Sequence, residues 1–276
     1  MSLTRYVTLA YGNQPGVYRQ SVMLLVSLVA FAPEPYELVV ATDRPECFVW
    51  FGTRVDIEYL DPSLLRAWAG PEPFSMRQKL MLLRTAWPDS GAVVLLDADI
   101  LARGPLTPFV EALHAGALFM HTREYTLSES RRAGNRRLWK ALQRTAIEGY
   151  TPSAEDAMWN SGVIGAPAAD RPSLDEAIAL YDTMGTRGIR HFATEQLVEG
   201  IVFGRTGRLR AADAWFTHYW GNKAGYDAEI ARRLSEAFLE GMSVKEAAAH
   251  YTRRPLDLPA EVRPTRAQKL RRWLSR

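Results

Sequence analysis

Runs of consecutive apolar residues recur along the first hundred positions of the chain, and turns or longer helical patterns separate them. These runs show almost no polar alternation, which is typical of strands covered on both faces of a sheet. A longer apolar stretch at 21–32 predicts a buried helix, and the segment 12–16 before it predicts a turn. We therefore predict an α/β fold with a mostly parallel central sheet. Its first strands are expected at 5–10, 36–43, 55–59 and 92–96.

Helix-start signals divide the rest of the chain. Ser75 with Gln78, and Ser173 with Glu176, have the spacing of a capping box, which satisfies free backbone N–H groups at a helix N-terminus. The polar, arginine-rich segment 123–158 predicts an inserted helical excursion. The predicted helices are 75–87, 173–184, 194–203, 227–240 and 243–251, and further strands are predicted at 117–121 and 159–164.

One charged side chain interrupts an apolar helix face. Lys79 lies within the stripe of the predicted helix 75–87, three residues after Met76 and four before Leu83. Two explanations stay open. The lysine either extends along the edge of the stripe with its ammonium group in water, or points toward the body of the protein for a chemical reason.

Composition narrows the class of protein. The 276 residues are 47% hydrophobic and 24% charged, which excludes a disordered, collagen-like or coiled-coil chain. With a single cysteine, Cys47, any metal would have to be held by Asp, Glu or His. The longest apolar stretch is too short to cross a bilayer, and the first residues lack the pattern of a secretory signal. We expect a cytoplasmic protein.

Positive charge is concentrated near the C-terminus. Residues 251–276 hold eight Lys or Arg against two acidic residues, a net charge of +6, whereas the whole chain carries +3. Residues 1–250 therefore carry −3, which gives no electrostatic footprint for nucleic acid. Within 264–276 the apolar residues Leu270, Trp273 and Leu274 share one helical face among basic residues. This pattern favours peripheral contact with an anionic membrane, at its inner face in a cytoplasmic protein, although docking on the protein's own acidic surface is an alternative.

Asp97-Ala98-Asp99 is the first candidate for chemistry. It directly follows the predicted strand 92–96, and ligands of open α/β sheets collect at the carboxyl ends of strands. Two carboxylates so close together repel each other, and a divalent cation would neutralise them. One alternative is a solvated turn with an Asp cap. Another is a phosphatase of the haloacid-dehalogenase type, but Leu101 departs from that pattern and the chain has no Asp-Asp pair.

The segment His218-Tyr-Trp-Gly221-Asn-Lys223 is the second candidate. Histidine can complete a metal shell begun by Asp, Gly221 lets the backbone approach a ligand closely, and Lys223 can neutralise phosphate. A histidine between aromatic residues is by itself more often a packed core residue. Its occurrence together with the Asp97-Ala98-Asp99 motif favours a shared metal site.

Several segments resemble, in this order, family 8 glycosyltransferases, the group of glycogenin and bacterial lipopolysaccharide galactosyltransferases. The resemblance spans about residues 4–225 and implies a GT-A fold, a nucleotide-sugar donor, normally a UDP-sugar, and transfer with retention of anomeric configuration. It rests on Tyr6-Val-Thr-Leu-Ala10, Ser27-Leu28, Lys79-Leu80, Val94-Leu-Leu-Asp97-Ala-Asp99, Asn160-Ser-Gly-Val163, Glu195-Gln196 and His218-x-x-Gly221.

The resemblance implies a metal site, a donor site and a pair of residues beside the reacting carbon. The metal, Mn²⁺ or Mg²⁺, would be bound by Asp97, Asp99 and His218. The donor would be bound by Thr8, Ala10, Tyr11, Lys79, Asp97, Asn160, Gly221 and Lys223, and the residues beside the reacting carbon would be Glu195 and Gln196. The chain departs from the family pattern in having Glu195 where Asp is usual, Lys223 one residue early, and a Tyr11-Gly-Asn13 loop.

We therefore predict a metal-dependent glycosyltransferase that moves a hexose to a glycan or lipid-linked acceptor. One GT-A domain over 1–225, with the insertion at 123–158, is expected to precede a helical, basic extension over 226–276. The main alternative is a non-enzymatic protein that holds an anionic partner or a membrane surface through its basic segments. Such a protein would not need Asp97, Asp99 and His218 together.

Overall fold

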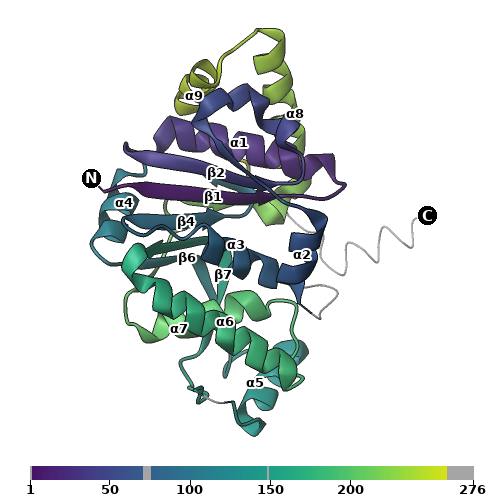
Figure 1. Cartoon of the computed structure of the whole chain (residues 1–276), viewed down its shortest axis with the longest axis vertical. Coiled ribbons are helices and arrows are strands. Elements are labelled where there is room, and N and C mark those ends of the chain that lie inside the picture. Colours follow the sequence, from purple (N-terminus) through teal and green to yellow (C-terminus); the bar gives the residue numbers. More distant parts are fainter. Residues whose placement is uncertain (1, 71–75, 148, 260–276) are drawn as a thin grey trace, which may run out of the picture.

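A seven-stranded sheet forms the centre of the computed structural model, which describes residues 2–70, 76–147 and 149–259 (Figure 1). Its strand order is β3-β2-β1-β4-β7-β6-β8. The strands are β1 Thr4–Ala10, β2 Tyr36–Thr42, β3 Asp56–Tyr59, β4 Ala92–Leu96, β6 Leu118–Thr126, β7 Ala157–Pro167 and β8 Leu209–Ala211. A separate small sheet pairs β5 Ile100–Ala102 with β9 Phe216–His218.

The sheet is mostly parallel. Strands β3, β2, β1 and β4 run in one direction, β8 is parallel to β6, and β7 is antiparallel to both of its neighbours. The predicted α/β fold is thus confirmed, and the four apolar runs of the first hundred residues are its parallel half. Strands β1 and β4 end at the same edge, because Thr8 lies opposite Leu96.

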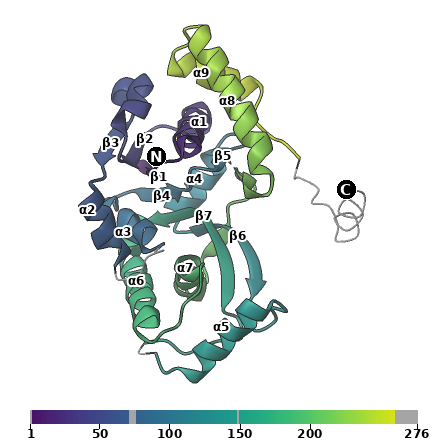
Figure 2. The same cartoon turned by 90° about the vertical axis from the view of Figure 1, so that its right-hand side faces the viewer.

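Helices cover both faces of the sheet (Figure 2). They are α1 Pro15–Phe31, α2 Pro62–Ala69, α3 Arg77–Thr85, α4 Thr107–His114, α5 Ala133–Arg144, α6 Arg171–Thr186, α7 Thr194–Arg205, α8 Lys223–Leu239 and α9 Val244–Arg253, with short 3₁₀ segments η1 Pro45–Arg54, η2 Ala168–Asp170 and η3 Tyr219–Asn222. In the part of the chain that the structure describes, none of the helices is long and apolar enough to span a bilayer.

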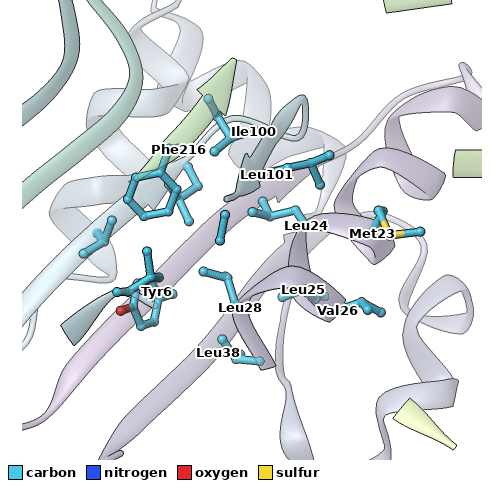
Figure 3. Packing of buried hydrophobic residues seen from close by; sticks show 14 of the residues in the cluster. Tyr6, Met23, Leu24, Leu25, Val26, Leu28, Leu38, Ile100, Leu101 and Phe216 are labelled. Carbon is cyan, nitrogen blue, oxygen red and sulfur yellow. The ribbon is translucent and has the colours of Figure 1, made fainter. Parts of the chain in front are cut away.

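Each face of the sheet has its own hydrophobic core. On one face α1, α8 and α9 pack together, and Leu24 and Leu28 of α1 lie near Tyr6 of β1 and Ile100 of β5 (Figure 3). On the other face α3, α6 and α7 pack over β4 and β7. Hydrogen bonds also tie the small sheet to α1 and α9, because the Ala102 N–H donates to Ser27 Oγ and the Ala102 carbonyl accepts from Tyr251 Oη.

Several helix and strand boundaries differ from the predicted ones. Helix α1 begins at Pro15, six residues before the apolar run at 21–32. Helix α6 begins at Arg171 with Pro172 in its first turn, so Ser173 lies inside the helix and is not its cap; proline is pre-organised for that position. In contrast, Ser243 and Glu246 form a complete capping box at the start of α9.

The predicted excursion at 123–158 is only partly helical. Strand β6 continues to Thr126 and β7 begins at Ala157, so the two form a long antiparallel pair that carries α5 beyond the body of the sheet. Helix α3 begins at Arg77, two residues later than expected, and the proposed cap Ser75 lies outside the described residues. The basic segment 264–276 also lies outside them.

Candidate functional site

The candidate site lies where β4 leaves the sheet. All five residues of β4 are buried, and Asp97 follows its last residue, Leu96. Because β7 is antiparallel to β4 with Val163 opposite Leu96, the residues before Val163 lie beside the turn after β4. The Asp97 N–H donates to the Gly162 carbonyl at 2.9 Å. Two segments far apart in the sequence, 97–99 and 160–162, therefore meet at this edge.

The small sheet brings His218 to the same place. The chain turns after Asp97 into β5, which pairs antiparallel with β9 so that Ile100 lies opposite His218. Buried Ile100 and Phe216 anchor the two short strands in the core. As a result, His218 Nε2 lies 3.3 Å from Asp99 Oδ1. One possible ligand atom from each of Asp97, Asp99 and His218 lies within 4.8 Å of the other two.

Asn160 and Gly162 set the orientation of the His218 ring. Asn160 Oδ1 accepts a hydrogen bond from the Gly162 N–H at 3.0 Å, and His218 Nδ1 lies 2.9 Å from the same oxygen. Since that atom is an acceptor, His218 donates to it through Nδ1–H, which leaves Nε2 facing the carboxylates. A Cβ on Gly162 would lie 2.6 Å from His218 Nδ1, so only glycine leaves room for the ring.

This donor set fits a divalent cation. Two carboxylates and one imidazole converge, and oxygen and imidazole ligands suit ions such as Mn²⁺. Burial raises the pKa of Asp99, but hydrogen bonds and charge interactions with His218 and Lys223 outweigh it and hold that pKa below its usual range. Asp99 is therefore ionised at neutral pH, as a metal ligand must be.

Lys79 is buried and joins Asp97, a member of the Asp97-Asp99-His218 group, to helix α7. Its Nζ lies 2.8 Å from Asp97 Oδ1 and 3.1 Å from Glu195 Oε1, and it donates to the carbonyl and the hydroxyl of Ser161. The alternative of a lysine extended into water is thus excluded. Burial lowers the pKa of Lys79, but the negative charges of Asp97, Glu195 and Glu199 overcome it and raise the pKa above its ordinary value. Lys79 is a permanent cation.

Glu195 and Gln196 begin helix α7 next to this lysine. The Glu195 side chain is buried, whereas Gln196 is partly exposed. Gly200, one turn further along α7, allows the helix to lie directly against β7, because a Cβ there would be 2.9 Å from the Ala157 carbonyl oxygen. The close packing of α7 on β7 therefore positions Glu195 beside Lys79.

Lys223 and Gly221 lie near Asp99 and His218, on the side that faces solvent. Lys223 is the first residue of α8, and its half-exposed side chain places Nζ 3.1 Å from Asp99 Oδ2. Gly221 belongs to η3, and a Cβ there would meet no atom within 4 Å. The space above Gly221 is thus open to a ligand.

The three expected residues at the end of β1 have different surroundings. Thr8 is buried, and its hydroxyl donates to the Leu96 carbonyl, so this side chain ties β1 to β4. Ala10 is also buried, at the last position of β1. Tyr11 is exposed and donates its hydroxyl to Gln78 Oε1 at 2.7 Å. The next residue, Gly12, donates its N–H to Asp43 at the end of β2.

Sequence reasoning missed several residues of the site. Ser161 and Gly162 lie in the quoted Asn160-Ser-Gly-Val163 motif, which was the only signal for them. Glu199 is completely buried one helical turn after Glu195. His121 of β6 packs edge-on against His218, and burial together with the His218 charge lowers its pKa to about 4. No pattern in the sequence marks Glu199 or His121.

Comparisons with known proteins agree with this architecture at the level of the fold. No family model and no curated protein sequence matches the chain. Among solved structures, it is similar to the galactosyltransferase LgtC with donor and acceptor sugar analogues (TM-score 0.50, 15% identity, 75% of this chain and 73% of that one). It is also similar to a glutamine-to-glutamate active-site mutant of LgtC (TM-score 0.51, 16% identity, 75% and 72%). A third match is mouse xyloside xylosyltransferase 1 in its apo form (TM-score 0.49, 10% identity, 76% and 85%). The similarity to the two LgtC structures shows that this chain has the GT-A fold of a glycosyltransferase.

Proposed function

We propose that the chain is a metal-dependent glycosyltransferase that uses a nucleotide-sugar donor, in the first place a UDP-sugar. One observation carries the proposal: Asp97, Asp99 and His218 converge at the carboxyl edge of a GT-A sheet, and buried Lys79 joins this group to Glu195. A GT-A fold alone does not require these groups to meet. Their convergence supports the joint handling of a diphosphate and a sugar.

Asp97, Asp99 and His218 would hold the metal, Mn²⁺ or Mg²⁺, which supplies Lewis-acid stabilisation of the leaving diphosphate when bound. Lys79 has four oxygen contacts already, so we infer that it orients Asp97 and Glu195 and does not move to the phosphates. Lys223 is half-exposed and can turn from Asp99 toward a phosphate.

The residues beside the reacting carbon would be Glu195 and Gln196. A carboxylate held in a buried position stabilises positive charge that develops on the anomeric carbon, and it is more effective there than in water. Retention of configuration follows from the family 8 resemblance. Asn160 faces His218, so its proposed contact with the donor sugar would involve its amide nitrogen, which now lies 3.4 Å from Glu124 Oε1.

The acceptor would be a glycan or a lipid-linked sugar. LgtC is named for transfer of galactose, which makes galactose the first donor sugar to test. The segment 264–276 would hold the enzyme at an anionic membrane, a proposal that the sequence alone supports. Cosedimentation with anionic liposomes that falls on raising salt and on deleting 264–276 tests it, and full-length protein that ignores such vesicles at low salt would refute it.

Thermal unfolding tests donor binding. UDP with Mn²⁺ is expected to raise the Tm, EDTA to abolish that rise, and Asp99→Asn to remove it, while Asp89→Asn at an exposed loop position keeps it. A nucleotide-induced rise that survives EDTA contradicts metal-bridged binding. Mass spectrometry of products from a panel of nucleotide sugars with Mn²⁺ then identifies the donor, and NMR of the new glycosidic bond decides between retention and inversion.

A further inference from the structure

Glu199 is a buried acid for which the proposed reaction has no direct use. Its side chain has no exposed surface. Within the described residues, neither of its carboxyl oxygens accepts a hydrogen bond from an N–H or O–H group. An isolated buried carboxylate is costly, and an apolar side chain would fill this space at lower free energy. The presence of an acid here therefore needs a specific interaction.

Charge counting around Lys79 identifies that interaction. Asp97, Glu195 and Glu199 all interact with the Lys79 ammonium group, so among these four described residues three ionised carboxylates would leave a net charge of −2. Lys79 is paired directly with Asp97 and Glu195, at 2.8 and 3.1 Å. Glu199 is thus the carboxyl group that is stabilised least as an anion and the one that keeps its proton.

The helix geometry directs that proton toward Glu195. The two glutamates are four residues apart on α7 and share one face, and a carboxylic acid has one O–H to donate. Burial raises the pKa of Glu199 well above its ordinary value, and the interaction with Glu195 raises it further. Because Glu199 has no exposed surface, bulk water does not compete for this hydrogen bond.

We propose that Glu199 is a positioning residue, a neutral acid that donates a hydrogen bond to the Glu195 carboxylate and fixes it beside the donor sugar. Lys79 holds the same carboxylate through its contact with Glu195 Oε1 at 3.1 Å. The proposal rests on the proposed function only in the role of Glu195; the hydrogen bond itself is independent of any substrate.

Infrared difference spectroscopy of the whole protein tests the hydrogen bond without substrate. The spectrum of the unmodified protein minus that of Glu199→Gln at neutral pH is expected to show the C=O stretching band of a protonated carboxylic acid. In Glu195→Gln this band should shift, because the acceptor of its hydrogen bond has changed. A difference spectrum without the band, or a band that Glu195→Gln leaves in place, overturns the proposal whether or not the protein is a glycosyltransferase.

Kinetics with UDP-galactose and Mn²⁺ test positioning. Glu199→Leu, which has no donor, should lower kcat about tenfold or more with little change in KM for the donor. Glu199→Gln keeps an N–H donor and should recover most of that loss. Circular dichroism and the Tm establish that both variants fold. Full activity of Glu199→Leu, or equal losses in both variants, overturns the positioning role. No turnover of any UDP-sugar by the unmodified protein contradicts the proposed function, while the infrared result still decides on Glu199.

Discussion

Replacing Lys79 with methionine removes the one cation that the described residues place among Asp97, Glu195 and Glu199, while keeping a side chain of similar length. Removal of one partner from a buried ion pair costs about 3–5 kcal/mol, because the other charge stays buried without compensation. Unfolding entropy of about 2.1 cal/mol/K per residue over 276 residues amounts to about 0.58 kcal/mol/K. We therefore expect the Tm of Lys79→Met to fall by about 5–9 °C at pH 7.5.

Differential scanning calorimetry measures this change, and Lys223→Met is the matched control. Lys223 also pairs with a site carboxylate, but its side chain is half-exposed, and such pairs contribute about 0–1 kcal/mol, which is a Tm change below about 2 °C. A fall for Lys79→Met no larger than that of Lys223→Met would refute the idea that Lys79 neutralises a buried cluster.

The pH dependence of the variant gives a second test with a defined sign. Without Lys79, Glu195 and Asp97 lose the ammonium group that contacts them at 3.1 and 2.8 Å, so they become carboxyl groups whose negative charge is uncompensated in the folded state. Groups of this kind favour the folded state at low pH and disfavour it as pH rises. The Tm difference between Lys79→Met and the unmodified protein should therefore shrink between pH 7.5 and 5, and a difference that grows on acidification contradicts the reasoning.

Three further predictions concern other parts of the fold. Gly162→Ala should displace the His218 ring and weaken Mn²⁺ binding in isothermal titration calorimetry, and unchanged affinity would show that the ring has room to move. Gly200→Ala should push α7 away from β7 and lower the free energy of unfolding by about 1–3 kcal/mol, as measured with denaturant. Gly204→Ala in the same helix has open space around its Cβ and should raise the free energy of unfolding by about 0.4–1 kcal/mol. Two arginines of α8 lower the pKa of Glu229 to about 2, so the contribution of Glu229 to stability is complete above its unfolded pKa and is lost as pH falls through 2. Glu229→Gln should therefore flatten the decline in Tm between pH 4.5 and 2. Parallel curves of Tm against pH for the variant and the unmodified protein would contradict this.

The parallel half of the sheet was predictable because strands buried on both faces require uninterrupted apolar residues. The reversed direction of β7 was not, since a buried run such as 159–164 has the same apolar character in either direction. The three-residue strands β5 and β9 are too short to have a periodicity of their own. Their pairing depends on tertiary packing, of β5 against α1 and of Phe216 against Phe109 of α4.

In the candidate site, the sequence pattern led to the carboxylates and to Lys79, because charged residues directly after or within apolar segments are conspicuous. The positions of Asn160 and Gly162 around His218 depend on the register between β7 and β4, which no local pattern encodes. Glu199 looks like an ordinary solvent-facing residue in the sequence. Its burial results from the packing of α7 against β7 and against α3, which carries Lys79, and this packing is set by tertiary structure.

The pairing of β5 with β9 also determines at which stage of folding Asp97, Asp99 and His218 can come together. More than a hundred residues of chain separate Ile100 from His218, and closing a loop of that length costs about 4 kcal/mol of chain entropy beyond a constant term. A growing chain therefore carries Asp97 and Asp99 long before the histidine is available, and the three residues converge only after β6, β7 and β8 have been added to the sheet. The proposed metal affinity would thus arise late in folding, and it could serve as a measure of how much of the protein has reached its native connectivity.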